Sequence, residues 1–143
     1  MHRLLIVRGS TNMIIPKSAR LSAFAADLRY QASLIDEFGG YLEDELSARI
    51  CSSSRALWIE IKGQTFYPGF QFDENRDLKA SMIEIITRLK LLKTPPQIVY
   101  WLTLPIVGIG NNRPIDLLNS FDNADHLLLE ALIRNLEDPR PYT

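Results

Sequence analysis

Residues 67–73 of the chain read Tyr67-Pro68-Gly69-Phe70-Gln71-Phe72-Asp73. They follow two short runs rich in β-branched and aromatic residues, 57–61 and 65–67, which flank a glycine turn at 62–64. Such runs on either side of a turn predict a β-hairpin. The proline and glycine at 68–69 end it, because proline fixes the backbone and lacks a hydrogen-bond donor. The sequence therefore predicts one hairpin near the centre of the chain, with large aromatic rings where the chain leaves it.

Downstream of the hairpin, apolar residues recur every three or four positions, which is the period of an α-helix. This pattern predicts helices over about 77–92, 95–104 and 114–119; the last two open on prolines, which the first helical turn tolerates. A fourth helix begins near Asp122, a suitable N-cap residue. The segment 105–114 is rich in glycine and asparagine and is predicted to be a loop. We therefore expect a C-terminal bundle of about four helices.

The N-terminal part is expected to be helical as well. One apolar stripe runs over 17–38, and the two glycines at 39–40 provide a stop, since glycine readily adopts the left-handed conformation that ends a helix. Apolar residues spaced four apart over 42–50 predict a second, shorter helix. The expected fold class is α+β and mostly helical, with a long N-terminal helix, one central β-hairpin and the C-terminal bundle. We expect a helical region over 1–56 and a second domain over 57–143.

The composition of the 143 residues, 46% hydrophobic and 23% charged, is typical of a globular protein. Sixteen basic and 17 acidic residues leave a net charge of −1, whereas dedicated nucleic-acid binders usually carry a large basic excess. The single cysteine, Cys51, excludes an internal disulfide and any multi-thiolate metal site. No apolar run approaches the ~20 residues that span a bilayer. These features indicate a cytoplasmic protein without membrane contact.

Three short elements follow one another in the second half of the chain. The first is 67–73, the second is Trp101-Leu102 with Pro105 shortly after, and the third is Arg113-Pro114-Ile115-Asp116-Leu117-Leu118. In this order they resemble the toxin-binding domain of Xre/MbcA/ParS-type antitoxins. That family closes its hairpin with YPAFQFD and has a corner that reads R-x-P-x-D-L-L or T-P-x-D-L-L. The resemblance covers residues 57 to about 136.

Most residues of these elements are expected to determine the fold rather than to contact a partner. Large rings and leucines suit a core, and the Asp116 carboxylate, two residues after Pro114, can accept hydrogen bonds from first-turn amides. The fold-determining positions are Tyr67, Pro68, Phe70, Phe72, Trp101, Pro114, Asp116, Leu117 and Leu118.

The resemblance implies a non-enzymatic protein that docks onto a partner toxin and neutralises it. Such toxins are often of the RES-domain type, which consumes NAD. No cofactor or metal is expected. One departure concerns Asn111, which stands where the family commonly has glycine, three residues before the corner proline; asparagine tolerates positive φ better than most residues. The candidate partner contacts lie in the 107–113 loop, on the last helix and in the tail: Val107, Asn111, Asn112, Arg113, Arg134 and Tyr142.

Two further classes of function stay open. Residues 46–57 resemble a degenerate helix-turn-helix, from which Arg49 and Arg55 could contact DNA phosphates. The second helix would have only one turn, which is too short to reach several bases in a major groove. Alternatively, alanines spaced along the N-terminal helix could allow it to pair with a second copy of the chain.

Only one pair of residues suggests an enzyme. Cys51 and His126 could be imagined as nucleophile and base. No oxyanion-loop pattern accompanies either residue, and free cysteines usually behave as small buried hydrophobes. We therefore expect no catalysis.

Overall fold

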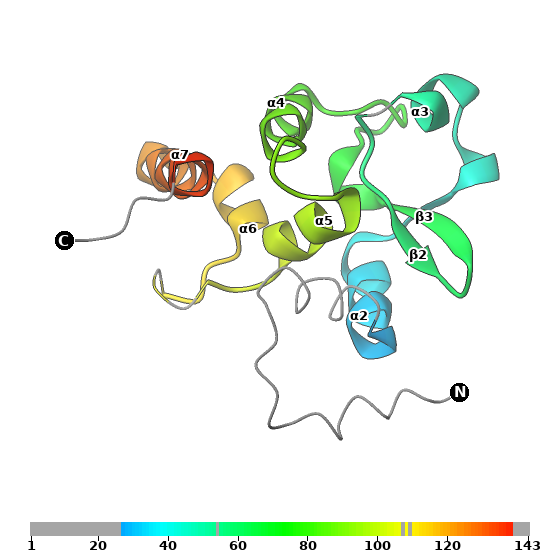
Figure 1. Ribbon diagram of the computed structural model, residues 1–143, viewed down its shortest axis with the longest axis horizontal. Helices are drawn as coiled ribbons and strands as arrows, with labels where there is room; N and C mark the ends of the chain where they lie inside the picture. Colours follow the sequence, from blue (N-terminus) through cyan, green and yellow to red (C-terminus); the bar gives the residue numbers. More distant parts are fainter. Residues whose placement is uncertain (1–26, 54, 107, 109, 139–143) are drawn as a thin grey trace.

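The computed structural model describes residues 27–53, 55–106, 108 and 110–138, and within them the fold is α+β and mostly helical, as predicted (Figure 1). None of these described helices is both long and apolar enough to cross a membrane. The elements, in chain order, are α2 (Leu28–Phe38), β1 (Gly40–Leu42), η2 (Glu43–Glu45), α3 (Ala48–Ser52), β2 (Ile59–Ile61), β3 (Gln64–Pro68), η3 (Gly69–Gln71), α4 (Ala80–Leu89), α5 (Pro95–Thr103), α6 (Pro114–Leu118) and α7 (Asn123–Glu137).

The predicted hairpin is confirmed by strands β2 and β3, which pair antiparallel with Glu60 opposite Thr65. Its turn has positive φ at both Lys62 (50°) and Gly63 (80°). A two-residue turn in which both residues have positive φ has a backbone twist that matches the right-handed twist of the flanking strands. Strand β3 ends at Pro68, and the 3₁₀ turn η3 follows at once.

The prediction of a helix over 42–50 is wrong in its first half. Leu42 is instead the last residue of strand β1, which adds a third antiparallel strand to the free edge of β3 and gives the sheet order β1-β3-β2. The turn η2 comes next, and only the five-residue helix α3, capped by Ser47, is α-helical. Gly39 and Gly40 both have positive φ (64° and 151°), which turns the chain back along β3. Pairing with a strand outweighs the weak tendency of so short a segment to form a helix.

The four helices predicted after the hairpin are all present as α4 to α7. Helix α5 begins with a reciprocal cap, in which the Thr94 hydroxyl accepts from the Gln97 amide (3.4 Å) and the Gln97 side chain accepts from the Thr94 amide (3.0 Å). Asp122 caps α7, as predicted, by accepting from the Ala124 amide at 2.9 Å. Helix α4 begins at Ala80, three residues later than expected.

The predicted N-terminal helix is described only in its second half. Helix α2 begins at Leu28, because Asp27 has extended backbone (ψ 126°) and its carboxylate accepts from the amides of Arg29 and Tyr30. The earlier part of the predicted helix, with most of its alanines, lies outside the described residues.

Two apolar clusters hold these elements together. The main one joins Leu34 of α2 and residues of both hairpin strands to helices α4 to α7. The smaller one lies around α3. Because β1 shares a sheet with β3 and Leu34 lies in the main cluster, packing and strand pairing both continue across the domain boundary expected at 56/57. The fully buried side chains of the main cluster include Leu57, Ile59, Met82, Ile86, Leu89, Ile98, Leu102, Ile115 and Ile133.

Candidate protein-binding surface

The three sequence elements that resemble the antitoxin family lie in one packed unit. Phe70, Leu117 and, half-buried, Trp101 and Leu118 belong to the main cluster. Tyr67 and Phe72 lie in the smaller cluster, so the 67–73 segment connects the two. Pro68 and Pro114 are buried as well.

The polar residue at the centre of this segment, Gln71, is completely buried. Its side-chain nitrogen donates to the carbonyl oxygens of Leu57 (2.7 Å) and Pro68 (3.1 Å), and its side-chain oxygen accepts from the Leu57 amide (2.7 Å). The Gln71 amide group therefore forms the hydrogen bonds that a neighbouring strand would otherwise form with the backbone of Leu57 and Pro68. Sequence reasoning missed this role; the signal was a lone glutamine between Phe70 and Phe72, in an otherwise apolar run.

Arg113, expected to face a partner, forms its main contacts within the chain. Its guanidinium makes paired hydrogen bonds to Glu37 (2.7 and 2.6 Å) and to Asp116 (2.7 and 2.8 Å) and lies 5.6 Å from the ring centroid of Phe38. The Asp116 carboxylate thus accepts from the Arg113 guanidinium, whereas the sequence predicted first-turn amides as its donors. The guanidinium lowers the pKa of both carboxyls, mainly through these hydrogen bonds. Arg113 therefore fastens the start of α6 to the end of α2.

The loop before α6 is a tight turn closed by backbone hydrogen bonds. Ile106 donates to Asn112 (3.0 Å), and the Asn111 amide donates back to Ile106 (3.2 Å). Asn111 has φ 62°, which confirms that asparagine there adopts positive φ; Gly110 does the same (73°). Asn111 and Asn112 are exposed, whereas Val107 lies outside the described residues.

Helix α7 has apolar residues on more of its circumference than the part that is buried against the rest of the protein. Leu129 and Ile133 face the main cluster and are buried. A second stripe spaced for a helix faces solvent: Leu127 is 71% exposed, and the ring of Phe121, just before the helix, is fully exposed. The apolar surface on and just before this helix, called the α7 face below, comprises the exposed residues Phe121, Ala124, Leu127 and Ala131, together with Leu128 and Leu132, which are half-buried and pack against the main cluster.

A charge network fixes one flank of α7 against α4. Arg88 donates to both oxygens of Glu130 (2.8 and 3.0 Å) and to Glu137 (2.7 Å), and Arg134 donates to Glu130 (2.9 Å). Hydrogen bonds from Arg88 lower the pKa of both glutamates. Arg134, a candidate partner contact, is 75% exposed at the edge of the α7 face, and Tyr142 lies outside the described residues.

Cys51 and His126 do not come together. The Cys51 thiol donates to the Glu43 carbonyl (3.3 Å) and packs against the smaller cluster. A His126 ring nitrogen lies 2.6 Å from the Ser120 carbonyl, beside a hollow of about 290 Å³ between α4, α6 and α7. Cys51 and His126 therefore lie in different surroundings, and the pairing of the two that the sequence raised is not formed.

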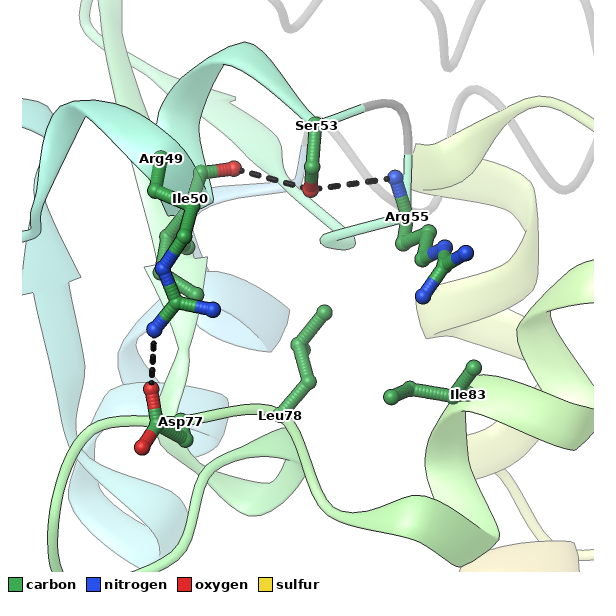
Figure 2. A pocket seen from close by; sticks show the side chains of 7 residues that line it. All are labelled: Arg49, Ile50, Ser53, Arg55, Asp77, Leu78 and Ile83. Atoms are coloured by element: carbon green, nitrogen blue, oxygen red, sulfur yellow. Dashed lines mark hydrogen bonds and ion pairs between the residues drawn. The ribbon is translucent and has the colours of Figure 1, made fainter.

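The segment that resembles a degenerate helix-turn-helix contains one short helix. Within 46–53 and 55–57, helix α3 is the single helical element, and the chain then runs into β2. Arg49, on α3, pairs with Asp77 at 2.7 Å. Arg49 and Arg55 lie on opposite sides of a second hollow, beside α3 (Figure 2).

A scan against protein-family models finds no match for this chain, and comparisons with curated proteins and with solved structures find none either.

Proposed function

We propose that this chain is a non-enzymatic, antitoxin-like cytoplasmic protein that docks onto a partner toxin and neutralises it. The observation that carries the proposal is the α7 face, where Leu127 and Phe121 are exposed beside half-buried Leu128 and Leu132. Exposed apolar residues grouped along one helix are typical of a surface that another protein covers.

The chemistry of the α7 face suits protein docking rather than a reaction. An exposed ring and neighbouring leucines are the side chains that supply affinity at the centre of an interface, with polar groups at the rim. Burial contributes about 25 cal/mol per Å² of apolar area. Arg134 lies at the rim, held by Glu130.

The resemblance to Xre/MbcA/ParS-type antitoxins supplies the class of partner. Its three elements pack in one unit here, around Phe70, Trp101 and Leu117, which is consistent with a domain that docks as one body. A toxin of the RES-domain type, whose active site the chain would cover, is the partner that this resemblance implies.

Co-expression with the product of the neighbouring reading frame tests the proposal. The tagged chain should copurify that protein, and Leu127→Glu should reduce copurification at least tenfold, because a charge then enters the apolar contact. Leu91→Glu is the matched control, since Leu91 is 84% exposed but lies between α4 and α5. Equal copurification by both variants would contradict docking through α7.

Two other functions can be tested by simpler measurements. A regulator that binds DNA through Arg49 and Arg55 would give a mobility shift on its own promoter at low salt, weakening as salt rises. A self-associating protein would instead use the α7 face between two copies, and light scattering would then report a dimer that Leu127→Glu dissociates.

A further inference from the structure

The hollow beside α3 is a second candidate binding site, independent of the α7 face. Its walls come from α3, from the segment after it, from the stretch between η3 and α4, and from α4 itself (Figure 2). Its volume is about 230 Å³, which is smaller than the ~300–1,000 Å³ of pockets that hold drug-sized ligands and cofactors. The size suits one or two side chains of a peptide. The lining residues are Arg49, Ile50, Ser53, Arg55, Asp77, Leu78 and Ile83.

The floor of this hollow is apolar. Ile50 is buried, Leu78 and Ile83 are half-buried, and the side chains of Leu78 and Ile83 point into the space between the two arginines (Figure 2). An aliphatic side chain inserted there would remove both its own surface and theirs from water.

The rim of the hollow is cationic. Arg49 and Arg55 stand on opposite sides, whereas the lining contains one carboxylate, Asp77, which Arg49 already binds at 2.7 Å (Figure 2). Among the described residues the Arg55 guanidinium has no partner, although its backbone is fixed, because the Arg55 amide donates to the Ser53 hydroxyl (3.4 Å) and that hydroxyl donates to the Ile50 carbonyl (3.0 Å). A guanidinium on fixed backbone and without a partner among the described residues is well suited to a carboxylate.

We propose that this hollow binds an acidic peptide segment of a partner protein, with an aliphatic side chain on Ile50, Leu78 and Ile83 and a neighbouring carboxylate on Arg55. The apolar floor favours a peptide over nucleic acid, because a phosphate backbone has no aliphatic group to place there. Asp77, at the rim, already pairs with Arg49, which leaves the Arg55 guanidinium for a single carboxylate rather than a pair of arginines for a run of phosphates.

Fluorescence anisotropy with a labelled peptide, Gly-Gly-Ser-Asp-Leu-Asp-Ser-Gly, tests this site. Binding should saturate below about 1 mM, as a single anchored side chain and one ion pair can supply. Replacing the leucine of the peptide by serine should weaken binding at least tenfold. Arg55→Gln should weaken it about tenfold, as for a lost hydrogen bond to a charged group. Arg29→Gln is the matched control, because Arg29 is 94% exposed on α2, away from the hollow.

A second measurement locates the peptide without any variant. Methyl NMR signals of Ile50 and Ile83 should shift on titration, while that of Ile133, in the main cluster, should not. Absence of saturation, equal binding of the serine peptide, equal loss in Arg29→Gln, or unmoved Ile83 signals would each overturn the site. A short DNA duplex that binds through Arg55 where the peptide does not would overturn it in favour of phosphate recognition. The peptide measurements do not depend on the α7 face. A failure of the copurification experiment would therefore leave them unchanged, and each proposal can be overturned without the other.

Discussion

The side-chain amide of Gln71 pairs with the backbone of Leu57 in both directions, accepting from its N–H and donating to its C=O, each at 2.7 Å. Both residues are completely buried. The same amide also donates to Pro68 at 3.1 Å. One glutamine thus satisfies three backbone groups where β2 has not yet begun and β3 has just ended, and it ties the entrance of the hairpin to its exit.

Replacement of Gln71 by leucine should destabilise the fold by about 2–4 kcal/mol, because buried backbone groups of Leu57 and Pro68 lose their partners. Urea denaturation followed by circular dichroism measures the change. Gln64→Leu is the control, since Gln64 is exposed on β3, and its effect should stay within about 0.5 kcal/mol. Similar stability of the two variants would show that the pairing contributes little.

Gly69 should not tolerate even a methyl group, although the resembled family has alanine there. A Cβ at this position would collide with the carbonyl oxygen of Phe38, at the end of α2, and backbone cannot rotate away. We expect Gly69→Ala to cost about 1–3 kcal/mol, as for other overpacked sites. In thermal denaturation the control Gly108→Ala, whose added methyl meets nothing within 4 Å, should be close to wild type.

Elements with local signals could be predicted from the sequence. The start of α5 at Pro95, the cap of α7 at Asp122 and the turn of the hairpin all depend on residues within three or four positions of one another. Each of these signals lies within a short stretch of sequence, so it can be recognised without knowing the rest of the fold.

Contacts between distant parts of the chain could not be predicted in this way. Strand β1 exists because it pairs with β3, whose residues come about 25 positions later. Arg113 pairs with Glu37, 76 positions away, so its placement inside the molecule depends on how α2 packs. The α7 face was expected only as a region around Arg134, because the pattern of leucines does not say which ones remain exposed.

The pairing of Arg113 should make stability depend on pH in acid. Hydrogen bonds from Arg113 lower the pKa of Glu37 and of Asp116 below their ordinary values of 4.5 and 3.8. As pH falls, the two carboxylates therefore become protonated in the unfolded chain before they do in the folded protein. Their contribution to the free energy of unfolding is complete above about pH 4.5 and is lost as pH falls through their lowered pKa values in the folded protein. Arg113→Met should remove about 1 kcal/mol at pH 7, a modest amount because the two carboxylates are 45% and 49% exposed.

Denaturation midpoints between pH 2 and pH 7 measure this dependence. Arg113→Met should flatten the acid limb of the curve relative to wild type. Arg134→Met, which removes an exposed pair along one helix, should keep most of the limb. If both variants follow the wild-type curve, Arg113 does not hold α6 to α2 in solution.

At alkaline pH the stability of the fold should depend on Tyr30 of α2, whose hydroxyl lies 2.6 Å from the Thr103 hydroxyl on α5. Burial raises the pKa of Tyr30 from 10.0 to about 12. Since the folded value is the higher one, the contribution to stability is complete below pH 10 and is lost as pH rises toward 12. Tyr30→Phe should cost about 1 kcal/mol at pH 7, the usual value of one hydrogen bond, because Thr103 keeps its donation to the Val99 carbonyl (2.8 Å). Between pH 10 and 12 the variant should lose stability less steeply than wild type, whereas the two curves should run parallel from pH 6 to 9. Phenolate absorbance at 295 nm gives an independent reading: one tyrosine fewer should ionise near pH 12 in the variant, and an unchanged titration there would mean that Tyr30 is not buried against α5.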